Sequence, residues 1–314
     1  MESKKSNPGY EEIVRKLEQK YEIMGQDLSS YLDGLLYSDY LTYWDYIHLD
    51  TLLSLQNPKT SFPDERVFIV YHQITELYFN LVIHELRQIT SFQDLTADFF
   101  ITRIKRVVNY FNNLVNSFTI MVDGLEKEQF LKFRMALLPA SGFQSAQYRQ
   151  IELMSTDLIN LVAIDERSAM TGKGPQELIE KLYWRKGATE LSSGVKTLTL
   201  RQFEEKYIRQ FQELGASFVS INLNQLYQKN FSGNKELEEQ LRAFDALANV
   251  HWPLAHLKSA GRYLKLDPED IKATGGTNWQ KYLPPRFQKI IFFPSLWSSQ
   301  EKEEWGKAAF THGS

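Results

Sequence analysis

Two histidines, His72 and His256, stand where a side chain could do chemistry. The chain has only six histidines and no cysteine. Without thiolates it cannot form disulfides, iron–sulfur clusters, zinc–thiolate sites or a thiolate-ligated haem. Any metal must therefore be held by histidine, carboxylate, tyrosine or methionine side chains, which makes each histidine worth weighing singly.

His72 lies on the apolar stripe of a predicted helix, because it follows Phe68 by four residues and precedes Phe79 by seven. Such a histidine is either a core residue bonded to its neighbours or a hydrogen-bonding, proton-handling group at a cavity wall. Glu76 follows four residues later, so the two side chains could also be ligands of a non-haem metal. The spacing leaves all three readings open.

His256 has Trp252 four residues before it and Arg262 six residues after it. The nearby residues are small, which leaves space for a large flat group: Ala255, Ser259, Ala260 and Gly261. Pro253 lacks a backbone donor and predicts a kink just before the histidine. An axial haem ligand fits this pattern, since imidazole is the usual ligand without thiolate, and so does an ordinary histidine beside a bent helix.

Arg134 follows Phe130 and Phe133 in an aromatic-rich segment. An arginine among aromatic rings is suited to gripping a carboxylate through paired hydrogen bonds, although a solvated surface charge is the commoner case. The stretch 273–277, ATGGT, permits close backbone approach to a ligand, but alone it is only a flexible turn.

The elements that carry these residues are predicted to be helices. Apolar positions recur every three or four residues over 10–36, 65–91, 97–122, 126–137, 199–229 and 234–265. An irregular connection with short helices is expected over 165–198, and no stretch alternates as a strand does. We therefore predict an all-α fold with a flexible N-terminus at 1–8 and one domain over 9–314.

Composition narrows the class of protein further. Apolar residues make up 43% and charged residues 24%, as in globular proteins, and the formal net charge is −3. That balance gives no basic surface for nucleic acid. No apolar run approaches the roughly 18 residues of a membrane span, and no signal-peptide pattern opens the sequence. We expect a cytoplasmic protein that binds neither nucleic acid nor membrane.

Four blocks in the same order resemble the tryptophan 2,3-dioxygenase family. They are YWDYIHLDTLLSLQNP (43–58), FIVYHQITELYF (68–79), FLKFRMALLPASGFQSAQYRQIE (130–152) and ATGGTNWQKYL (273–283). The SGFQSxQYRxIE portion is long and specific, and the resemblance spans about 41–297. It implies a haem b enzyme, one Fe(II) haem per subunit, that inserts O₂ across the indole C2–C3 bond of L-tryptophan to give N-formyl-L-kynurenine.

By position, the resemblance implies that His256 is the axial ligand of the haem iron and that His72 is the catalytic distal histidine beside the indole N–H. The residues it implies for substrate binding are Phe68, Ile69, Val70, Tyr71, His72, Phe130, Arg134, Thr274, Tyr43 and Tyr46. Those it implies for the haem pocket are Leu137, Ser141, Gly142, Trp252 and Arg262. The two N-terminal tyrosines match residues that reach a neighbouring subunit's site, which implies a homotetramer, a dimer of dimers.

The sequence departs from the family pattern in three places. Phe130 stands where many relatives have tyrosine, the loop reads TGGTNW where many read TGGSSG, and the segment from His256 to Thr274 is longer. Phe130 keeps one alternative open, an oxygenase of the same fold for a modified tryptophan or other indole. Two further alternatives are a non-enzymatic haem or indole sensor and a helical protein with a non-haem metal on His72 and Glu76.

Overall fold

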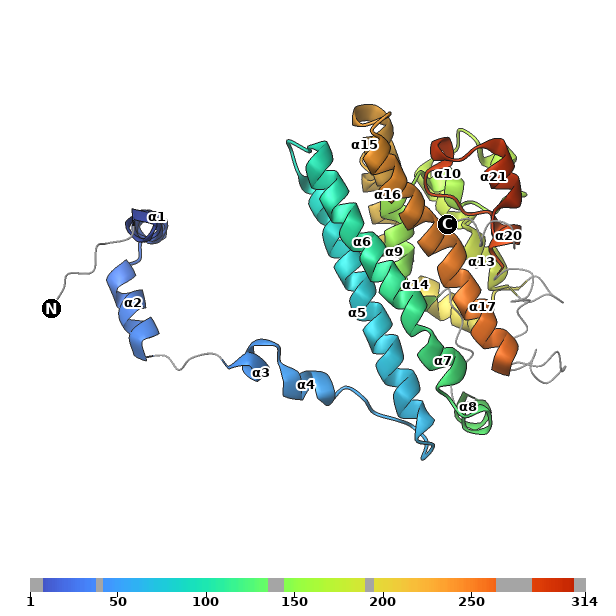
Figure 1. Cartoon of the computed structure of the whole chain (residues 1–314), viewed down its shortest axis with the longest axis horizontal. Coiled ribbons are helices and arrows are strands. Elements are labelled where there is room, and N and C mark those ends of the chain that lie inside the picture. The colour runs from blue at the N-terminus through green and yellow to red at the C-terminus, as the bar shows by residue number, and fades with distance from the viewer. Residues whose placement is uncertain (1–7, 38–41, 135–143, 190–194, 264–283, 308–314) are drawn as a thin grey trace. The chain divides into compact units, whose positions relative to one another are not determined.

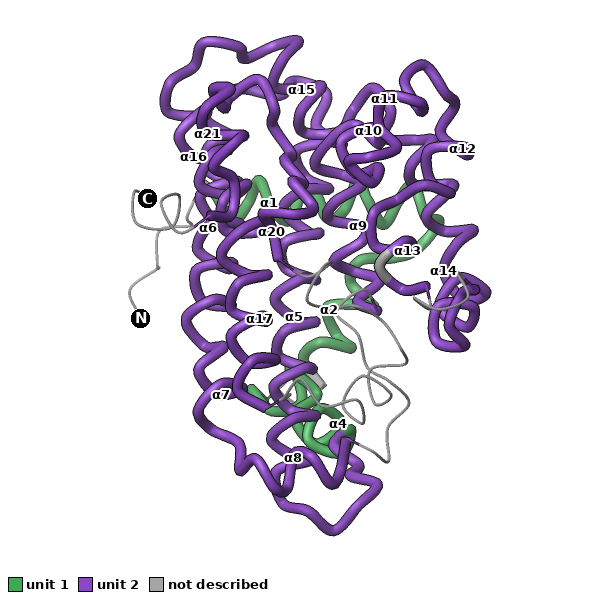
Figure 2. The backbone as a smooth tube through the Cα atoms, turned by 90° about the vertical axis from the view of Figure 1, so that its right-hand side faces the viewer, with its two compact units in different colours: residues 1–55 green, residues 56–314 purple. Residues whose placement is uncertain are grey.

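The structure is a computed structural model that describes residues 8–37, 42–134, 144–189, 195–263 and 284–307. Helices and loops make up these ranges, and the pairings of strand type there are isolated bridges, Val162 with Leu182 and Thr189 with Lys196. The predicted all-α class is thus confirmed for the described part of the chain. Two compact units, residues 1–55 and 56–314, are coloured separately in Figure 2; the prediction of one domain over 9–314 stays a prediction.

The first unit consists of four helices, α1 (Pro8–Ile23), α2 (Leu28–Tyr37), α3 (Tyr43–Tyr46) and α4 (Leu49–Leu53). The prediction of a single helix over 10–36 is wrong, because the chain turns between α1 and α2. Gly25 makes this turn at φ +66, a left-handed conformation that other residues rarely adopt. Thr42 caps α3 by accepting a hydrogen bond from the Asp45 N–H.

The second unit is built on long helices, and the two over 64–91 and 97–117 lie side by side in Figure 1. The long helices are α5 (Asp64–Ser91), α6 (Ala97–Ser117), α14 (Leu198–Ser217), α16 (Lys235–Ala246) and α17 (Trp252–Tyr263), with α9 (Ala146–Ser155) packed on α5 and α14. The predicted helix over 65–91 is confirmed as α5. The core between α5, α6 and α16 is filled by aromatic rings, among them Phe79, Phe111 and Phe244.

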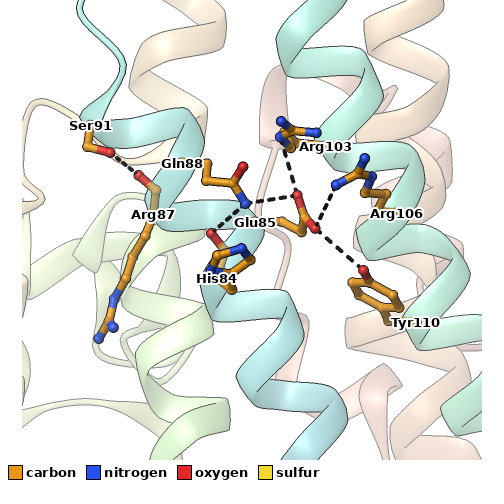
Figure 3. Close-up of polar contacts among 8 residues, drawn as sticks. All are labelled: His84, Glu85, Arg87, Gln88, Ser91, Arg103, Arg106 and Tyr110. Atoms are coloured by element: carbon orange, nitrogen blue, oxygen red, sulfur yellow. Dashed lines mark hydrogen bonds and ion pairs between the residues drawn. The ribbon is translucent and has the colours of Figure 1, made fainter. Parts of the chain in front are cut away.

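Helices α5 and α6 are also joined by a buried carboxylate, that of Glu85 (Figure 3). Arg103 Nε lies 3.4 Å and Arg106 Nη1 lies 3.3 Å from its oxygens, and the Tyr110 hydroxyl lies 3.4 Å away. Gln88 donates to it from the next turn of α5. The charge is therefore compensated by two guanidinium groups from α6, as a buried ion requires.

Shorter helices complete the unit. They are α7 (Thr119–Asp123), α8 (Lys127–Arg134), α10 (Leu158–Leu161), α11 (Arg167–Met170), α12 (Pro175–Glu180), α13 (Tyr183–Gly187), α15 (Leu223–Asn230), α20 (Pro285–Gln288), the 3₁₀ turn η3 (Pro294–Leu296) and α21 (Ser299–Glu304). The expected short helices within 165–198 are thus found. The helices predicted over 97–122 and 199–229 each divide in two, the second where Asn222 caps α15. Within the described ranges no helix is both long and apolar enough to cross a membrane.

The helix predicted over 234–265 is divided by a π-helical segment, η2 (Leu247–His251), between α16 and α17. The Trp252 N–H reaches back five residues to the Leu247 carbonyl instead of four. Pro253 follows directly and has no N–H, so the sequence signal for a distortion at this point corresponds to a widened turn. This turn sets the direction from which α17 presents His256.

Candidate active site

His72 projects from the middle of α5, one helical turn after Phe68. Its Nδ1 lies 2.7 Å from the main-chain oxygen of Phe68, and the two rings lie 4.0 Å apart. A carbonyl oxygen can only accept, so Nδ1 carries the hydrogen of the neutral ring. Nε2 is then left as an acceptor on a side chain that is exposed on the described surface.

The surroundings of His72 favour this neutral form. Desolvation by the surrounding protein lowers the pKa of the imidazole, while the bond to Phe68 and the charge of Glu76 oppose that shift. The carboxylate of Glu76 is itself held from α9: the Gln147 amide donates to both its Oε2 and its main-chain oxygen at 2.8 Å. His72 therefore presents a hydrogen-bond acceptor at neutral pH.

Helix α8 brings Phe130 and Arg134 to the same region. The Phe130 ring lies 6.3 Å from the ring of Phe68, and the guanidinium carbon of Arg134 lies 5.7 Å from the Phe130 ring. Phe133 packs edge-on against Phe68 at 5.6 Å and is fully buried. An aromatic surface, a hydrogen-bond acceptor and a cation thus stand together, which suits a planar molecule bearing a carboxylate.

His256 lies on α17 with its ring between Trp252 at 4.5 Å and Phe118 at 4.4 Å. Its Nδ1 donates to the Trp252 carbonyl across 3.2 Å, so Nε2 bears the free lone pair. Burial lowers the pKa of His256 to about 4; the bond to Trp252 opposes this shift, and the charge of His72 adds to it. Neutral imidazole with Nδ1 bonded to a carbonyl is the form in which histidine ligates a metal, so this residue fits a haem ligand.

The two histidines are connected through aromatic side chains. Tyr71 lies edge-on to Phe118 at 5.7 Å, and Phe118 contacts His256. Helices α5 and α17 both pack against α6, α7 and α8. Tyr71 also lies edge-on to His72 at 6.3 Å, so a run of ring contacts joins the two histidines.

Other predicted site residues lie at the edges of this region. Ile69 and Val70 are half-buried on α5, whereas Tyr71 is buried and donates to the Leu114 carbonyl in the α5–α6 interface. Trp252 is buried beside His256. Arg262 is exposed on α17 and pairs with Asp123 at 2.8 Å.

Some predicted residues are not brought to this region by what the structure describes. Tyr43 and Tyr46 belong to α3 of the first unit, where their side chains are exposed. Leu137, Ser141, Gly142 and Thr274 lie outside the described residues. The predicted roles of all these residues stay predictions.

Sequence reasoning missed two side chains of the 130–152 block. Gln147 links α9 to Glu76, as described above, and Tyr148 donates to the Ala248 carbonyl of η2 across 2.7 Å. The sequence did carry one signal for them. The matching block is longer than carboxylate binding by Arg134 alone would require. A third feature, His251, lines a shallow recess of about 330 Å³ with Phe118, Leu254 and Lys258, on another face of the helix from His256.

The alternative of a non-haem metal held by His72 and Glu76 finds no third ligand among the described residues. Among the side chains that the structure describes, no three of histidine, aspartate and glutamate converge to hold an ion. The Glu76 carboxylate that would serve beside His72 accepts from Gln147 instead.

Comparison with known proteins points to one group of enzymes. A family model described as tryptophan 2,3-dioxygenase matches residues 34–163. Tryptophan 2,3-dioxygenase of Ruegeria pomeroyi is 27% identical over 83% of this chain and 92% of its own length. That of Polaromonas naphthalenivorans is 26% identical over 83% and 91%, and that of Sorangium cellulosum is 40% identical over 36% and 30%.

All three of these relatives are named as dioxygenases, a class of oxidoreductase. Over most of its length the chain is thus similar to tryptophan 2,3-dioxygenases.

Proposed function

We propose that this protein is a haem-dependent dioxygenase that converts L-tryptophan and O₂ to N-formyl-L-kynurenine. The observation that carries the proposal is the pair of neutral imidazoles, His72 and His256, each with its Nδ1 hydrogen committed to a main-chain carbonyl. Each ring thereby offers an Nε2 lone pair, one for a metal and one for a substrate N–H. The similarity to tryptophan 2,3-dioxygenases supports the reaction class.

His256 would hold the iron of the haem. Its low pKa supports this role, because a ligating nitrogen must be unprotonated. The bond from Nδ1 to Trp252 fixes the ring, and Phe118 packs on it. When bound, ferrous haem supplies the oxygen chemistry that opens the indole C2–C3 bond, both oxygen atoms ending in the product.

His72 and Phe68 would orient the indole. The Nε2 of His72 accepts the indole N–H, while the ring of Phe68 packs on the indole face. His72 acts as an orienting partner and not as a base, because an indole N–H is far too weakly acidic for imidazole to remove. Burial of about 200 Å² of indole contributes about 5 kcal/mol, and it does so for many indoles alike.

Selectivity for an amino acid would come from Arg134. A guanidinium beside the aromatic surface of Phe130 can bind the substrate carboxylate with two hydrogen bonds. Thr274, from outside the described residues, is proposed to bind the ammonium and carboxylate groups. Leu137, Ser141, Gly142 and Arg262 are proposed for the haem pocket on the family pattern alone.

The proposal extends to assembly. Exposed aromatic residues of α3, including Tyr43 and Tyr46, are proposed to reach a neighbouring subunit in a homotetramer. A cytoplasmic location is proposed with it, as expected from the sequence.

One experiment tests the proposal directly. The purified protein is loaded with haem, its absorption spectrum is recorded, and it is reduced and given tryptophan in air while formylkynurenine is monitored. A Soret band with product formation is expected. A Soret band with tryptophan binding and no product would replace the proposal with the sensor, and lack of any haem binding would overturn it.

A second candidate, an oxygenase for a modified tryptophan or another indole, is favoured by Phe130. This ring has no hydroxyl beside Arg134, and it packs on Tyr263 at 4.8 Å. A panel of tryptophan and its methylated and hydroxylated forms separates the two candidates through their kcat/KM values. A higher value for a substituted indole would favour the second.

A further inference from the structure

The π-helical segment η2 joins the core helix α16 to the helix that carries His256. In this segment the Trp252 N–H bonds to the Leu247 carbonyl, five residues earlier. Trp252 is also the residue whose carbonyl receives the Nδ1 hydrogen of His256. Trp252 therefore links the η2 segment directly to the His256 ring.

The widened turn leaves one carbonyl without its usual backbone donor. With the Trp252 N–H directed to Leu247, the next nitrogen, that of residue 253, would serve the Ala248 carbonyl. Residue 253 is proline and has no hydrogen to donate. Ala248 is fully buried, so water does not reach its carbonyl either.

Tyr148 of α9 fills this gap. Its hydroxyl donates to the Ala248 carbonyl across 2.7 Å, and its side chain is buried against Phe79, with ring centroids 5.3 Å apart. Burial raises the pKa of the phenol, so the hydroxyl keeps its hydrogen at any pH at which the protein works. A side chain a hundred residues away thus replaces the missing backbone N–H.

The segment is held from a second direction by Asp245. This buried carboxylate accepts from the Asn249 amide of η2 at 2.8 Å. It also accepts from the main-chain N–H groups of Phe292 and Phe293 at 2.9 and 3.0 Å, and from the Trp297 indole at 2.9 Å. Contacts with α9 and with the C-terminal segment therefore both hold η2 in place. We infer that η2 is a rigid support for α17 and not a hinge.

We propose that Tyr148 is a positioning residue for His256: by satisfying the Ala248 carbonyl it fixes the π-helical turn that aims the imidazole. This inference rests on the proposed role of His256 as the haem ligand. It assigns a task to the 130–152 block that is separate from substrate binding by Arg134, since Tyr148 is buried in the core, where it packs on Phe79 and bonds to the Ala248 carbonyl. π-Helical turns in proteins often occur at functional sites, as this one does.

The test is the Tyr148→Phe variant of the full chain loaded with haem, with Tyr227→Phe as matched control. Tyr227 is also buried and donates its hydroxyl across 2.8 Å, but to Glu238, away from η2 and α17. In Tyr148→Phe we expect a shift of the iron–histidine band in the resonance Raman spectrum and haem release about tenfold faster. Tyr227→Phe leaves both unchanged. Equal behaviour of the two variants would overturn the proposal.

A double-mutant cycle identifies the carbonyl as the cause. Pro253→Ala restores an N–H at position 253, which gives the Ala248 carbonyl a backbone donor. The effect of Tyr148→Phe on haem release should therefore shrink severalfold in the Pro253→Ala background. An undiminished effect there would show that the ring of Tyr148, and not its hydroxyl bond, matters, and would overturn the proposal.

Hydrogen exchange separates this inference from the proposed function. The amides of 247–252 should exchange about tenfold faster in Tyr148→Phe than in Tyr227→Phe, with or without haem. If His256→Ala still binds haem through histidine, the ligand assignment fails even though this difference persists. If His256→Ala loses haem and the exchange rates are equal, the ligand assignment holds and the role of Tyr148 is refuted.

Discussion

The imidazole of His72 donates its Nδ1 hydrogen to the main-chain oxygen of Phe68 across 2.7 Å. This bond fixes the tautomer, so the ring offers an unprotonated Nε2 to its exposed side. The Phe68 ring, proposed to pack on the indole, lies 4.0 Å from this imidazole, so the two groups stand beside each other. A neutral imidazole in this form accepts a hydrogen bond more readily than it removes a proton.

Replacement of His72 by alanine should therefore slow the reaction without abolishing it. Loss of one orienting hydrogen bond costs about 1–1.5 kcal/mol, which corresponds to a fall in kcat/KM of about tenfold, while the Soret band is kept. The control is His84→Ala, three turns along the same helix, which should behave as the parent protein. Complete loss of turnover with haem still bound would instead make His72 an essential base.

Replacement of His256 by alanine should abolish stable haem binding. The ring lies between Trp252 and Phe118 with its Nδ1 hydrogen engaged, and no other described imidazole shares this environment. The matched control is His251→Ala, five residues earlier on a different helical face, which should retain the His-ligated spectrum. If the His251 variant loses haem and the His256 variant keeps it, the axial ligand is His251 and the assignment is wrong.

The affinity for haem should be insensitive to pH down to an unusually acid range. Protons compete with iron for Nε2 only as the pH approaches the pKa of the free ring, and burial lowers that pKa from 6.5 to about 4. Binding is therefore expected to be level from pH 8 to about 5 and to weaken by about tenfold per pH unit below about 4. The measurement is the Soret absorbance during acid titration, with far-ultraviolet circular dichroism to show that the helices persist. A midpoint near 6.5 with intact helices would mean that the ligand is not shielded as described.

The same burial predicts how the haem-free protein responds to acid. The unfolded chain takes up a proton on His256 near pH 6.5, whereas the native ring does so only near pH 4. Stability should therefore fall as the pH drops through this window, and the fall is complete below about 4.

Sequence patterns predicted the helical class and the α5 boundaries well, because the apolar stripe of α5 is long and uninterrupted. They also singled out His72 and Arg134, and the family resemblance added Phe68 and Phe130. The structure brings these four residues together from α5 and α8. They did not predict the break at Gly25, since a glycine inside an amphipathic pattern is compatible with a continuous helix. The part played by Tyr148 was also out of reach, because it depends on a carbonyl a hundred residues away that lacks a donor.

Arg134 offers the sharpest test of substrate recognition. Leucine in its place keeps an apolar stem beside Phe130 but removes the charge-assisted bonds to a carboxylate, each of which contributes about 1.5–3 kcal/mol. We expect KM for tryptophan to rise between about tenfold and about a hundredfold, with the Soret band unchanged because Arg134 lies on α8 and not on the helix of His256. Steady-state kinetics under air provide the measurement.

The control for Arg134 is Lys132→Leu on the same helix. Lys132 is exposed and lies over the ring of Phe62 at 5.7 Å, so its removal changes the charge of α8 equally without reaching Phe130. If both variants raise KM alike, the effect is one of overall charge, which falls off with screening. If only Arg134→Leu does so, and if indole without the amino-acid group binds equally well to the variant and the parent, the guanidinium reads the carboxylate. An unchanged KM in Arg134→Leu would refute the proposal that Arg134 binds the substrate carboxylate.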